Sequence, residues 1–178
     1  KRFGAEVVKE SETYFDFSAA RNHASSLAKN DMVSFVDADE ELTRLDIDKI
    51  DELIDQGFTQ FEYNFVFSHD QFGAEHVKFI QCKFFDRRTL CWTGLVHEMV
   101  TGSGRIYRLP EDIFKLEHWQ NFETNRHSYL VGLAVDCYEH PDKDRNSHYF
   151  ARELMWSGFL EPAIKEFERH IAMNRWDQ

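Results

Sequence analysis

Short apolar stretches of two kinds alternate over the first two thirds of the chain. Phenylalanine or tyrosine occupies every second position from Phe61 to Phe67, which predicts a half-buried strand from Gln60 to Ser68. The unbroken apolar run from Met32 to Val36 predicts a buried strand. Apolar residues at helical spacing predict a helix from Phe17 to Ala28, which Asp16 or Ser18 could cap.

The same kind of pattern predicts the remaining elements. A helix from Ile47 to Ile54 would end at Gly57. Further strands are expected at 5–8, 77–85, 90–100, 106–109 and 113–116, and helices around 129–137, 149–155 and 162–171. The sequence therefore predicts a mixed α/β domain over residues 1–120 and an all-helical extension over residues 121–178.

Composition and charge narrow the class of protein. The 178 residues are 42% hydrophobic and 30% charged, which is typical of a compact folded domain. Lys and Arg number 21 against 32 Asp and Glu, and a surface with a net charge of −11 repels a nucleic-acid backbone. No apolar run approaches the ~20 residues that cross a bilayer, so no membrane span is predicted. The three cysteines show no CxxC spacing, which favours a reducing, cytoplasmic location.

The strongest chemical signal is the acidic segment from Asp37 to Glu40, directly after the Met32–Val36 run. In open α/β sheets the ligand crevice lies outside the strand ends, so acids are informative there. Asp37 and Asp39 could turn toward one hard cation, Mn²⁺ or Mg²⁺, whose charge neutralises a diphosphate. The alternative is a helix N-terminus, where acidic residues are favoured without any ligand.

The neighbouring segments make the acidic motif more specific. Residues 16–22 read DFSAARN, residues 31–40 read DMVSFVDADE, residues 92–98 read WTGLVHE, and residues 116–118 read LEH. In this order, over nearly the whole chain, they resemble a family 2 glycosyltransferase of the GT-A fold. The resemblance implies a Rossmann-like mixed sheet flanked by helices.

The resemblance also implies a metal-dependent, inverting transfer of one sugar from a nucleotide-sugar donor, a UDP-sugar by expectation. Asp37, Asp39 and His118 would form the metal site, with Asp39 as the direct ligand. Arg21 and Asn22 would bind the donor. The acceptor would be a glycan, a protein or a small molecule. The alternatives are a solvated Arg21 and an Asn22 that only hydrogen-bonds locally.

On the acceptor side, the resemblance makes Glu98 the base that deprotonates the attacking hydroxyl. His97 and Trp92 are candidates for substrate binding. Glu98 could instead form an ion pair at a strand edge, and His97 could be a partly buried imidazole. Trp92 and Trp119 are either core residues or a floor on which a sugar stacks.

The last third of the chain looks like one tetratricopeptide-type helical hairpin, in Ser147–Gly158 and Pro162–Phe167. A single hairpin is short of the ~3 repeats that stand alone, so we expect it to pack on the transferase domain. Docking of a protein acceptor is the second possibility.

Two departures from the family pattern bear on function. The family opens with strand–helix units that hold the nucleotide, and the chain starts after them, so we expect a fragment whose donor binding alone is in doubt. The QxxRW element of processive synthases is absent, which favours single-sugar transfer. The rival function is a non-catalytic, transferase-like binding module. A metal-dependent phosphohydrolase would need a second acid cluster.

Overall fold

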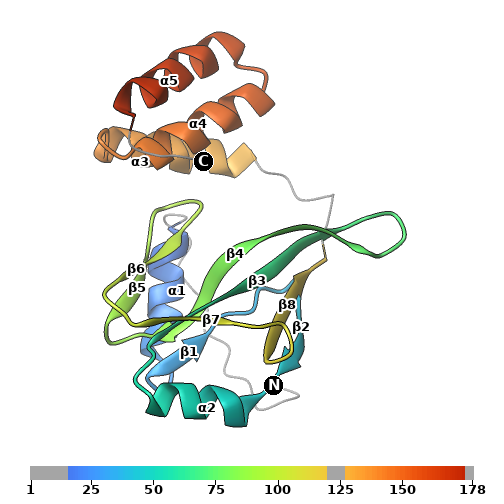
Figure 1. Ribbon diagram of the computed structural model, residues 1–178. Helices are drawn as coiled ribbons and strands as arrows, with labels where there is room; N and C mark the ends of the chain where they lie inside the picture. Colours follow the sequence, from blue (N-terminus) through green and yellow to red (C-terminus); the bar gives the residue numbers. More distant parts are fainter. Residues whose placement is uncertain (1–15, 120–126, 175–178) are drawn as a thin grey trace. The chain divides into compact units, whose positions relative to one another are not determined.

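The computed structural model describes residues 16–119 and 127–174 (Figure 1). The predicted strand at residues 5–8 lies outside these ranges. The elements in chain order are α1 (Phe17–Ser26), β1 (Met32–Ser34), β2 (Glu40–Leu45), α2 (Ile47–Asp55), β3 (Gln60–His69), β4 (Glu75–Asp86), β5 (Leu90–Thr93), β6 (Met99–Gly102), β7 (Ile106–Leu109), β8 (Phe114–His118), α3 (His127–Glu139), α4 (Asp144–Trp156) and α5 (Leu160–Met173).

The chain divides into two compact units, which we describe separately. Among the described residues, the sheet unit contains 22–92 and 99–119, and the helical unit contains 16–21, 93–98 and 127–174. The helical unit thus includes two segments, 16–21 and 93–98, that precede the predicted boundary at residue 120.

The sheet unit is built on a mixed sheet with strand order β1-β4-β3-β8-β2, and β7 pairs with β3 beside this path. The pairs β1/β4, β3/β4 and β2/β8 are antiparallel, whereas β3 pairs with β7 and β8 in parallel. Strands β5 and β6 form a separate two-stranded sheet. The predicted mixed α/β architecture with a helical C-terminal part is confirmed.

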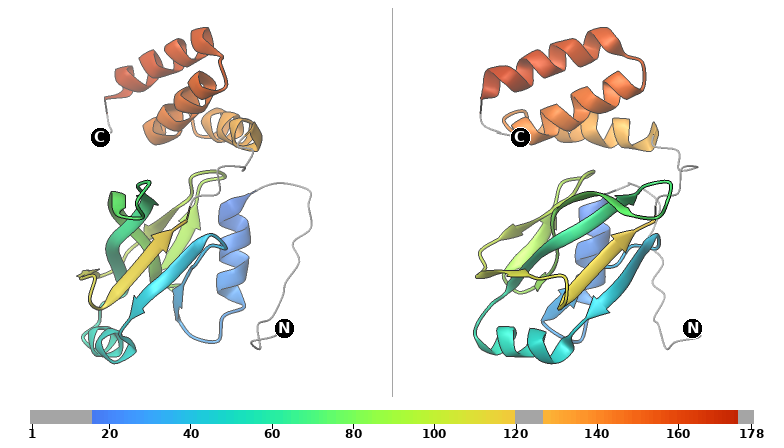
Figure 2. Two further views of the ribbon diagram at one scale, coloured as in Figure 1. Left: turned by 90° about the vertical axis from the view of Figure 1, so that its right-hand side faces the viewer. Right: turned by 45° about the vertical axis from the view of Figure 1, so that its right-hand side comes forward.

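The alternation predicted for β3 places its aromatic side chains in the core. Phe61 and Tyr63 are fully buried, and Phe65 is 4% exposed. Helix α2 lies across one end of the curled sheet (Figure 2), where Ile50 and Leu53 join the same cluster. The Asp46 side chain caps this helix by accepting a hydrogen bond from the Lys49 backbone N–H at 3.1 Å. The buried residues of β3, at every second position, and those of α2, at helical spacing, therefore pack in one core.

The long β3–β4 hairpin closes through a turn that Asp70 holds. Its carboxylate accepts hydrogen bonds from the backbone N–H groups of Phe72 and Ala74 at 2.8 and 2.9 Å. These hydrogen bonds lower the pKa of Asp70. Gly73 follows with φ of 82°, a conformation that favours glycine. The hairpin is the long projection at the right of the sheet in Figure 1.

The Met32–Val36 run differs from its prediction. Strand β1 has three residues, of which only Val33 is buried, and Val36 is 45% exposed. Strand β1 has one neighbour, β4, so it lies at an edge of the sheet. An edge strand is paired along one side only, and an apolar run by itself does not reveal this. Strand β2 directly follows the acidic segment, so the alternative of a helix N-terminus there is wrong.

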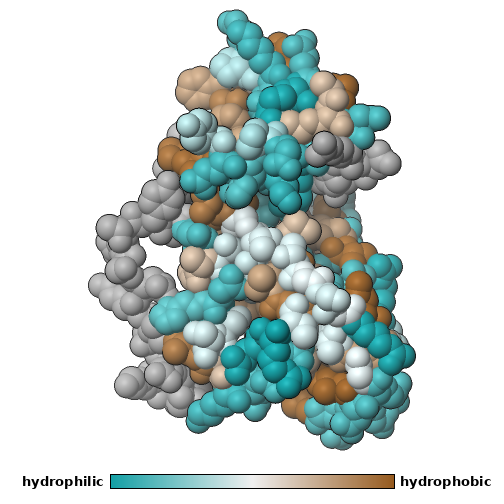
Figure 3. All heavy atoms as spheres, turned by 90° about the vertical axis from the view of Figure 1, so that its left-hand side faces the viewer, coloured by the Kyte–Doolittle hydropathy of each residue, from teal (hydrophilic) through white to brown (hydrophobic). Residues whose placement is uncertain are grey.

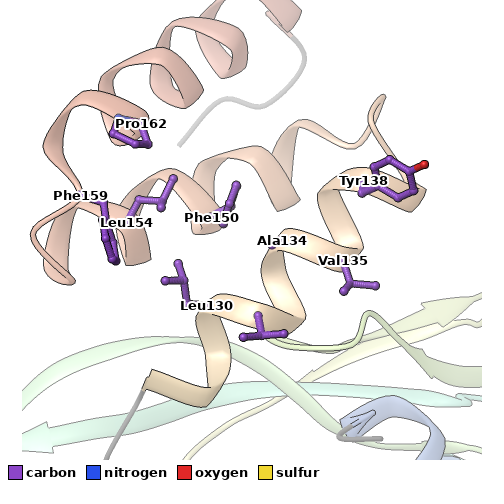
Figure 4. Close-up of a pocket in the computed structure, with 9 residues that line it drawn as sticks. Leu130, Ala134, Val135, Tyr138, Phe150, Leu154, Phe159 and Pro162 are labelled. Atoms are coloured by element: carbon purple, nitrogen blue, oxygen red, sulfur yellow. The ribbon is translucent and has the colours of Figure 1, made fainter.

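In the helical unit, α4 packs against both α3 and α5. Small buried residues, Ser147 and Ala151 on α4 and Ala163 on α5, allow close packing, and the Ser147 hydroxyl donates to the Glu166 carbonyl oxygen at 3.2 Å. An apolar groove of about 540 Å³ lies between α3 and the other two helices (Figure 4). Two antiparallel helices are thus present where the tetratricopeptide-type hairpin was predicted, and that identification stays a prediction.

Figure 3 shows hydrophilic residues over much of one face, with hydrophobic residues between them. Within the described ranges, no helix is both long and apolar enough to pass through a bilayer.

All cysteines are free, and burial raises the pKa of Cys82 to about 11 and that of Cys137 to about 12. Cys91 is exposed.

Candidate functional site

The acidic segment forms a tight turn between β1 and β2. The Glu40 backbone N–H donates to the Asp37 carbonyl oxygen at 3.0 Å, and the Asp37 backbone N–H donates to the Glu40 carboxylate at 2.9 Å. Two hydrogen bonds between Asp37 and Glu40 therefore hold the turn. Asp39, inside the turn, is exposed.

A lysine from β4 fixes this turn. The Lys83 ammonium lies 2.7 Å from the Asp37 carboxylate and also donates to Glu40. The side chains of Lys83 and Glu40 are only 7% and 3% exposed. A buried cation between two carboxylates is stable because each charge is paired, and removing one partner would leave a buried charge alone.

Lys83 was not identified from the sequence. Its signal is a lysine next to two phenylalanines at the end of β4, where the other three of the last four residues, Phe84, Phe85 and Asp86, are buried as well. A charged residue in such a run needs a buried partner. The partners, Asp37 and Glu40, are more than forty positions away, so the sequence alone does not name them.

Asp39 turns to a different partner. Its Oδ2 lies 3.2 Å from Nε2 of His118, the last residue of β8. The other ring nitrogen, Nδ1, lies 2.9 Å from the Phe67 carbonyl oxygen. Because a carbonyl oxygen only accepts, Nδ1 carries a proton and donates it there. This bond fixes the imidazole with Nε2 directed at the carboxylate.

Nε2 of His118 and Oδ2 of Asp39 lie close enough to share a proton or a cation. An imidazole that donates from Nδ1 has a lone pair on Nε2 in its neutral form, and two lone pairs at 3.2 Å repel each other. Either a proton on Nε2 or a cation held by both atoms relieves that repulsion. Metal-binding histidines characteristically donate the opposite N–H to a backbone carbonyl, as His118 does.

A second pair of predicted site residues meets in the helical unit. Nε of Arg21 donates to Oε1 of Glu98 at 2.6 Å, although the two residues are 77 positions apart. Their side chains are 18% and 13% exposed, so the ion pair is partly screened from water. Such a pair orients the carboxylate and holds it in place.

The family model described as Glycosyl transferase family 2 matches residues 1–114, more than half of the 178-residue chain. This chain belongs to glycosyl transferase family 2. The family expected from the motifs is thus confirmed, and the mixed sheet with flanking helices is consistent with a GT-A-like fold. No curated protein matches the sequence.

Membership in glycosyl transferase family 2 supports a glycosyltransferase in general terms, with a nucleotide-sugar donor and an acceptor. The matched region contains all the predicted site residues except His118. It ends before the helices α3, α4 and α5. The match therefore bears on the transferase part and leaves the helices to be interpreted from their contacts.

The predicted three-residue metal set is divided in this family 2 structure. Asp39 and His118 face each other, whereas the carboxylate of Asp37 is paired with Lys83. Within 16–119 and 127–174, no group of three His, Cys, Asp or Glu side chains could hold a metal ion. Two adjacent ligands of octahedral Mg²⁺, each at 2.0–2.1 Å, lie about 3 Å apart. The Asp39–His118 spacing of 3.2 Å is compatible with two such ligands.

The loop that carries Glu98 belongs to the helical unit. The Leu95 backbone N–H donates to Oδ2 of Asp136 on α3 at 2.8 Å. Asp136 is 3% exposed, and burial raises its pKa against the opposing effect of backbone N–H donors from Leu95 and Val96. Val96 also packs closely against α3, because a Cβ added to Gly132 would lie 2.4 Å from its side chain.

His97 is held by α4 in an unusual backbone conformation. Its φ is 55°, a value that residues other than glycine seldom adopt. Its ring stacks on Tyr149 at 4.2 Å, and Arg145 donates to its carbonyl oxygen at 2.8 Å. Backbone strain of this kind persists only where the surroundings impose it. The predicted substrate-binding residue therefore also anchors the loop to α4.

Asn22 and Trp92 form a structural pair. The Asn22 amide donates to the Trp92 carbonyl oxygen and accepts from the Trp92 backbone N–H, both at 2.9 Å. Asn22 thus pairs with β5 much as a neighbouring strand would, through bonds between residues 70 positions apart, which differ from the local hydrogen bonds of the alternative. The Trp92 ring is 3% exposed among Val33, Phe85 and Leu90. Of its two predicted roles, the structure shows the core residue.

Proposed function

We propose that the chain acts as an inverting, metal-dependent transferase that moves one sugar from a nucleotide diphosphate, with a UDP-sugar as the expected donor. The observation that supports it is the Asp39–His118 pair, with His118 fixed through Nδ1 on the Phe67 carbonyl. Two fixed ligand atoms of this kind suit a cation whose remaining ligands would come from the diphosphate.

Asp39 and His118 would hold Mn²⁺ or Mg²⁺. When bound, the ion would offset the charge that develops on the departing diphosphate. Asp37 contributes indirectly, because its ion pair with Lys83 keeps the turn closed and Asp39 exposed. The site is preorganised, so little conformational freedom is lost when the ligand arrives.

Glu98 would accept the proton of the attacking acceptor hydroxyl. Arg21, which the resemblance assigns to the donor, is paired with Glu98 and would therefore orient the proposed base. Its guanidinium orients one carboxylate oxygen, and the loop contacts to Asp136 and Tyr149 keep Glu98 at a fixed place in the helical unit. Direct displacement by the deprotonated hydroxyl inverts the anomeric carbon.

Calorimetric titration of UDP, with and without Mn²⁺, tests the proposal. We expect UDP to bind with Mn²⁺ present, and Asp39→Asn to abolish the effect of the metal. Asp55→Asn, an exposed carboxylate at the end of α2, is the matched control and should bind like the native chain. Equal UDP binding with and without Mn²⁺, or none, would contradict the proposal and favour the non-catalytic binding module.

A further inference from the structure

Two stacked rings lie beside the Asp39–His118 pair, at the end of β8. The rings of His69 and Trp119 are parallel within 4°, with centroids 4.0 Å apart. Trp119 is nevertheless 48% exposed. The imidazole covers one face of the indole, and about half of the residue stays accessible in spite of that contact. Trp92, by contrast, is a core residue at 3% exposure.

Hydrogen bonds fix the indole. Its Nε1 donates to the Glu41 carboxylate at 3.2 Å, and the Trp119 backbone N–H donates to the Asp39 carbonyl oxygen at 2.8 Å. The second bond joins two backbone groups, so it places residue 119 beside the acidic turn without itself restraining the ring. The indole cannot turn without breaking its bond to Glu41 on β2.

The imidazole beneath the indole is fixed in the same manner. Nε2 of His69 lies 3.0 Å from Oε2 of Glu117, which is 8% exposed. Lys115 and Thr43 hold the other oxygen of Glu117, at 2.7 and 3.0 Å. Burial alone would raise the pKa of Glu117, but the hydrogen bonds from Lys115, His69 and Thr43 outweigh it and lower the pKa. The buried Glu117 carboxylate thus holds the His69 ring in the position in which it stacks on Trp119.

A half-exposed tryptophan held so rigidly is suited to bind a flat ligand. Ordering a mobile side chain costs free energy on binding, and here that cost is already met by the fold. Aromatic faces attract positively polarised hydrogens and other π-systems. The structure therefore offers a prepared stacking surface next to the candidate cation site.

The charges around the indole indicate which ligand fits. Glu41 bonds the indole, and Asp39 bonds the backbone of residue 119. The Lys115 ammonium is paired with Glu75 and Glu117. An acidic surrounding repels phosphates and other anions. It accepts hydrogen bonds from hydroxyl groups, because a carboxylate is an acceptor only. A neutral ring with C–H bonds on its face and hydroxyls on its rim matches both features.

We propose that the exposed face of Trp119 stacks on a pyranose ring, and that Glu41 accepts hydrogen bonds from the hydroxyls of that sugar. The proposal extends the transferase function proposed above, since the stack shares a backbone bond with Asp39. The ring could belong to the donor sugar or to the acceptor, and the chemistry of recognition is the same for both.

Binding measurements on Trp119→Leu test the proposal. Leucine keeps an apolar side chain of substantial volume and removes the flat face. Trp156→Leu changes a tryptophan that is 56% exposed on α4 and is the matched control. The probes are UDP, UDP-glucose, UDP-galactose and UDP-N-acetylglucosamine by calorimetry with Mn²⁺. The methyl glycosides of the same three sugars are followed by saturation-transfer NMR.

Two results would support the proposal and assign the source of the ring. If the donor sugar stacks, Trp119→Leu weakens a UDP-sugar by about tenfold and leaves UDP itself unchanged, in line with the energy of a base stacked on an aromatic side chain. If the acceptor stacks, the substitution removes methyl glycoside binding and leaves every UDP-sugar unchanged. Trp156→Leu should change none of these.

Other results would overturn it. One is that all probes bind Trp119→Leu as they bind the native chain. Another is that neither the methyl glycosides nor the sugar part of any donor adds to binding. If Trp119→Leu unfolds, intermolecular NOEs in the native chain decide: NOEs between the sugar C–H protons and the assigned indole protons of Trp119 would support the stack, and their absence with bound sugar would reject it. UDP binding that needs Mn²⁺ and Asp39 while no sugar binds would retain the transferase site and reject the stack.

Discussion

The Asp39–His118 pair and the Arg21–Glu98 pair are held by different kinds of structure. The first lies at the ends of paired strands, with His118 bonded to the backbone of β3 and Asp39 in a turn fixed by buried Lys83. The second depends on a loop, residues 94–98, which is bound to helices α3 and α4 by side chains. Cation binding would therefore share the stability of the sheet core, whereas the base would share that of the helical unit.

The difference matters because local stability is not uniform within a protein. Segments with few buried contacts open more readily than the core. If the two pairs open independently, substitutions in one unit should affect one chemical step and spare the other. The following predictions test that separation, from the largest effect on free energy to the smallest.

Lys83→Met should have the largest effect. It leaves the Glu40 carboxylate buried without its cation, which costs about 3–5 kcal/mol when a buried pair loses one partner. We expect a lower urea midpoint together with loss of Mn²⁺-dependent UDP binding. Lys49→Met removes an exposed ion pair to Glu52 and should cost less than about 1 kcal/mol. Equal effects of the two substitutions would show that Lys83 does not support the turn.

Glu98→Gln should reduce turnover by about a hundredfold or more, because glutamine cannot accept the proton of the acceptor hydroxyl. UDP affinity in the presence of Mn²⁺ should stay the same, since Asp39 and His118 are unchanged. Initial-rate kinetics and calorimetry on the same preparation measure both quantities. Unchanged turnover would remove Glu98 from the mechanism, and a parallel loss of UDP affinity would show that the two pairs are not separable.

Asp136→Ala should loosen the loop and leave the sheet unit intact. It removes the acceptor of the buried Leu95 N–H, at a cost of about 1–3 kcal/mol. Hydrogen exchange at the Leu95 and Val96 amides should accelerate, whereas exchange in β3 should not change. Asp136→Asn keeps an acceptor oxygen and should show a smaller effect. Faster exchange in both units would mean that the loop and the sheet open together.

Low pH should also affect the stability of the two regions differently, by less than the substitutions above. Hydrogen bonds from Lys115 and Lys78 lower the pKa of Glu75 to about 2, and the pKa of Glu117 is lowered as well. The unfolded chain takes up these protons first, so this stabilisation is complete above about pH 4.3 and is lost as the pH falls toward about 2. The pKa of Asp136 is raised by burial, so acid does not weaken the fold through that group.

The pH dependence can be measured as hydrogen exchange in β8 and at Leu95 between pH 5 and pH 2.5. We expect protection in β8 to fall by more than protection at Leu95. Glu75→Gln should reduce the pH dependence in β8, because it removes one of the titrating carboxylates. An identical fall at both places would contradict the separate stabilisation of the two regions.

Much of the fold follows from local patterns. The alternation in β3, the helical spacing of α2 with Gly57 after it, and the three C-terminal helices were predicted from short stretches of sequence. Strand β2 was missed because four of its six residues are exposed and most are polar. Its hydrogen bonds come from β8, which is 69 to 78 positions away, and a local pattern does not contain that pairing.

The sequence named the residues of the candidate site, but it did not indicate most of the contacts that hold them. The motifs named Asp39, His118, Arg21 and Glu98, and the structure brings them together as two pairs. The buried Lys83, the Asp136 anchor and the strained backbone of His97 were not foreseen. Each of these depends on tertiary contacts between distant segments. The motifs along the chain therefore named candidate residues but not the groups that hold those residues in place.

The unequal environments of the cysteines provide a practical handle. The thiols of Cys82 and Cys137 stay protonated near neutral pH because their pKa values are about 11 and 12. Cys91 is exposed on β5, one position before the tryptophan that pairs with Asn22. A maleimide fluorophore should consequently attach at this one position without any cysteine being replaced. Its emission would then report on the strand that leads into the loop carrying Glu98.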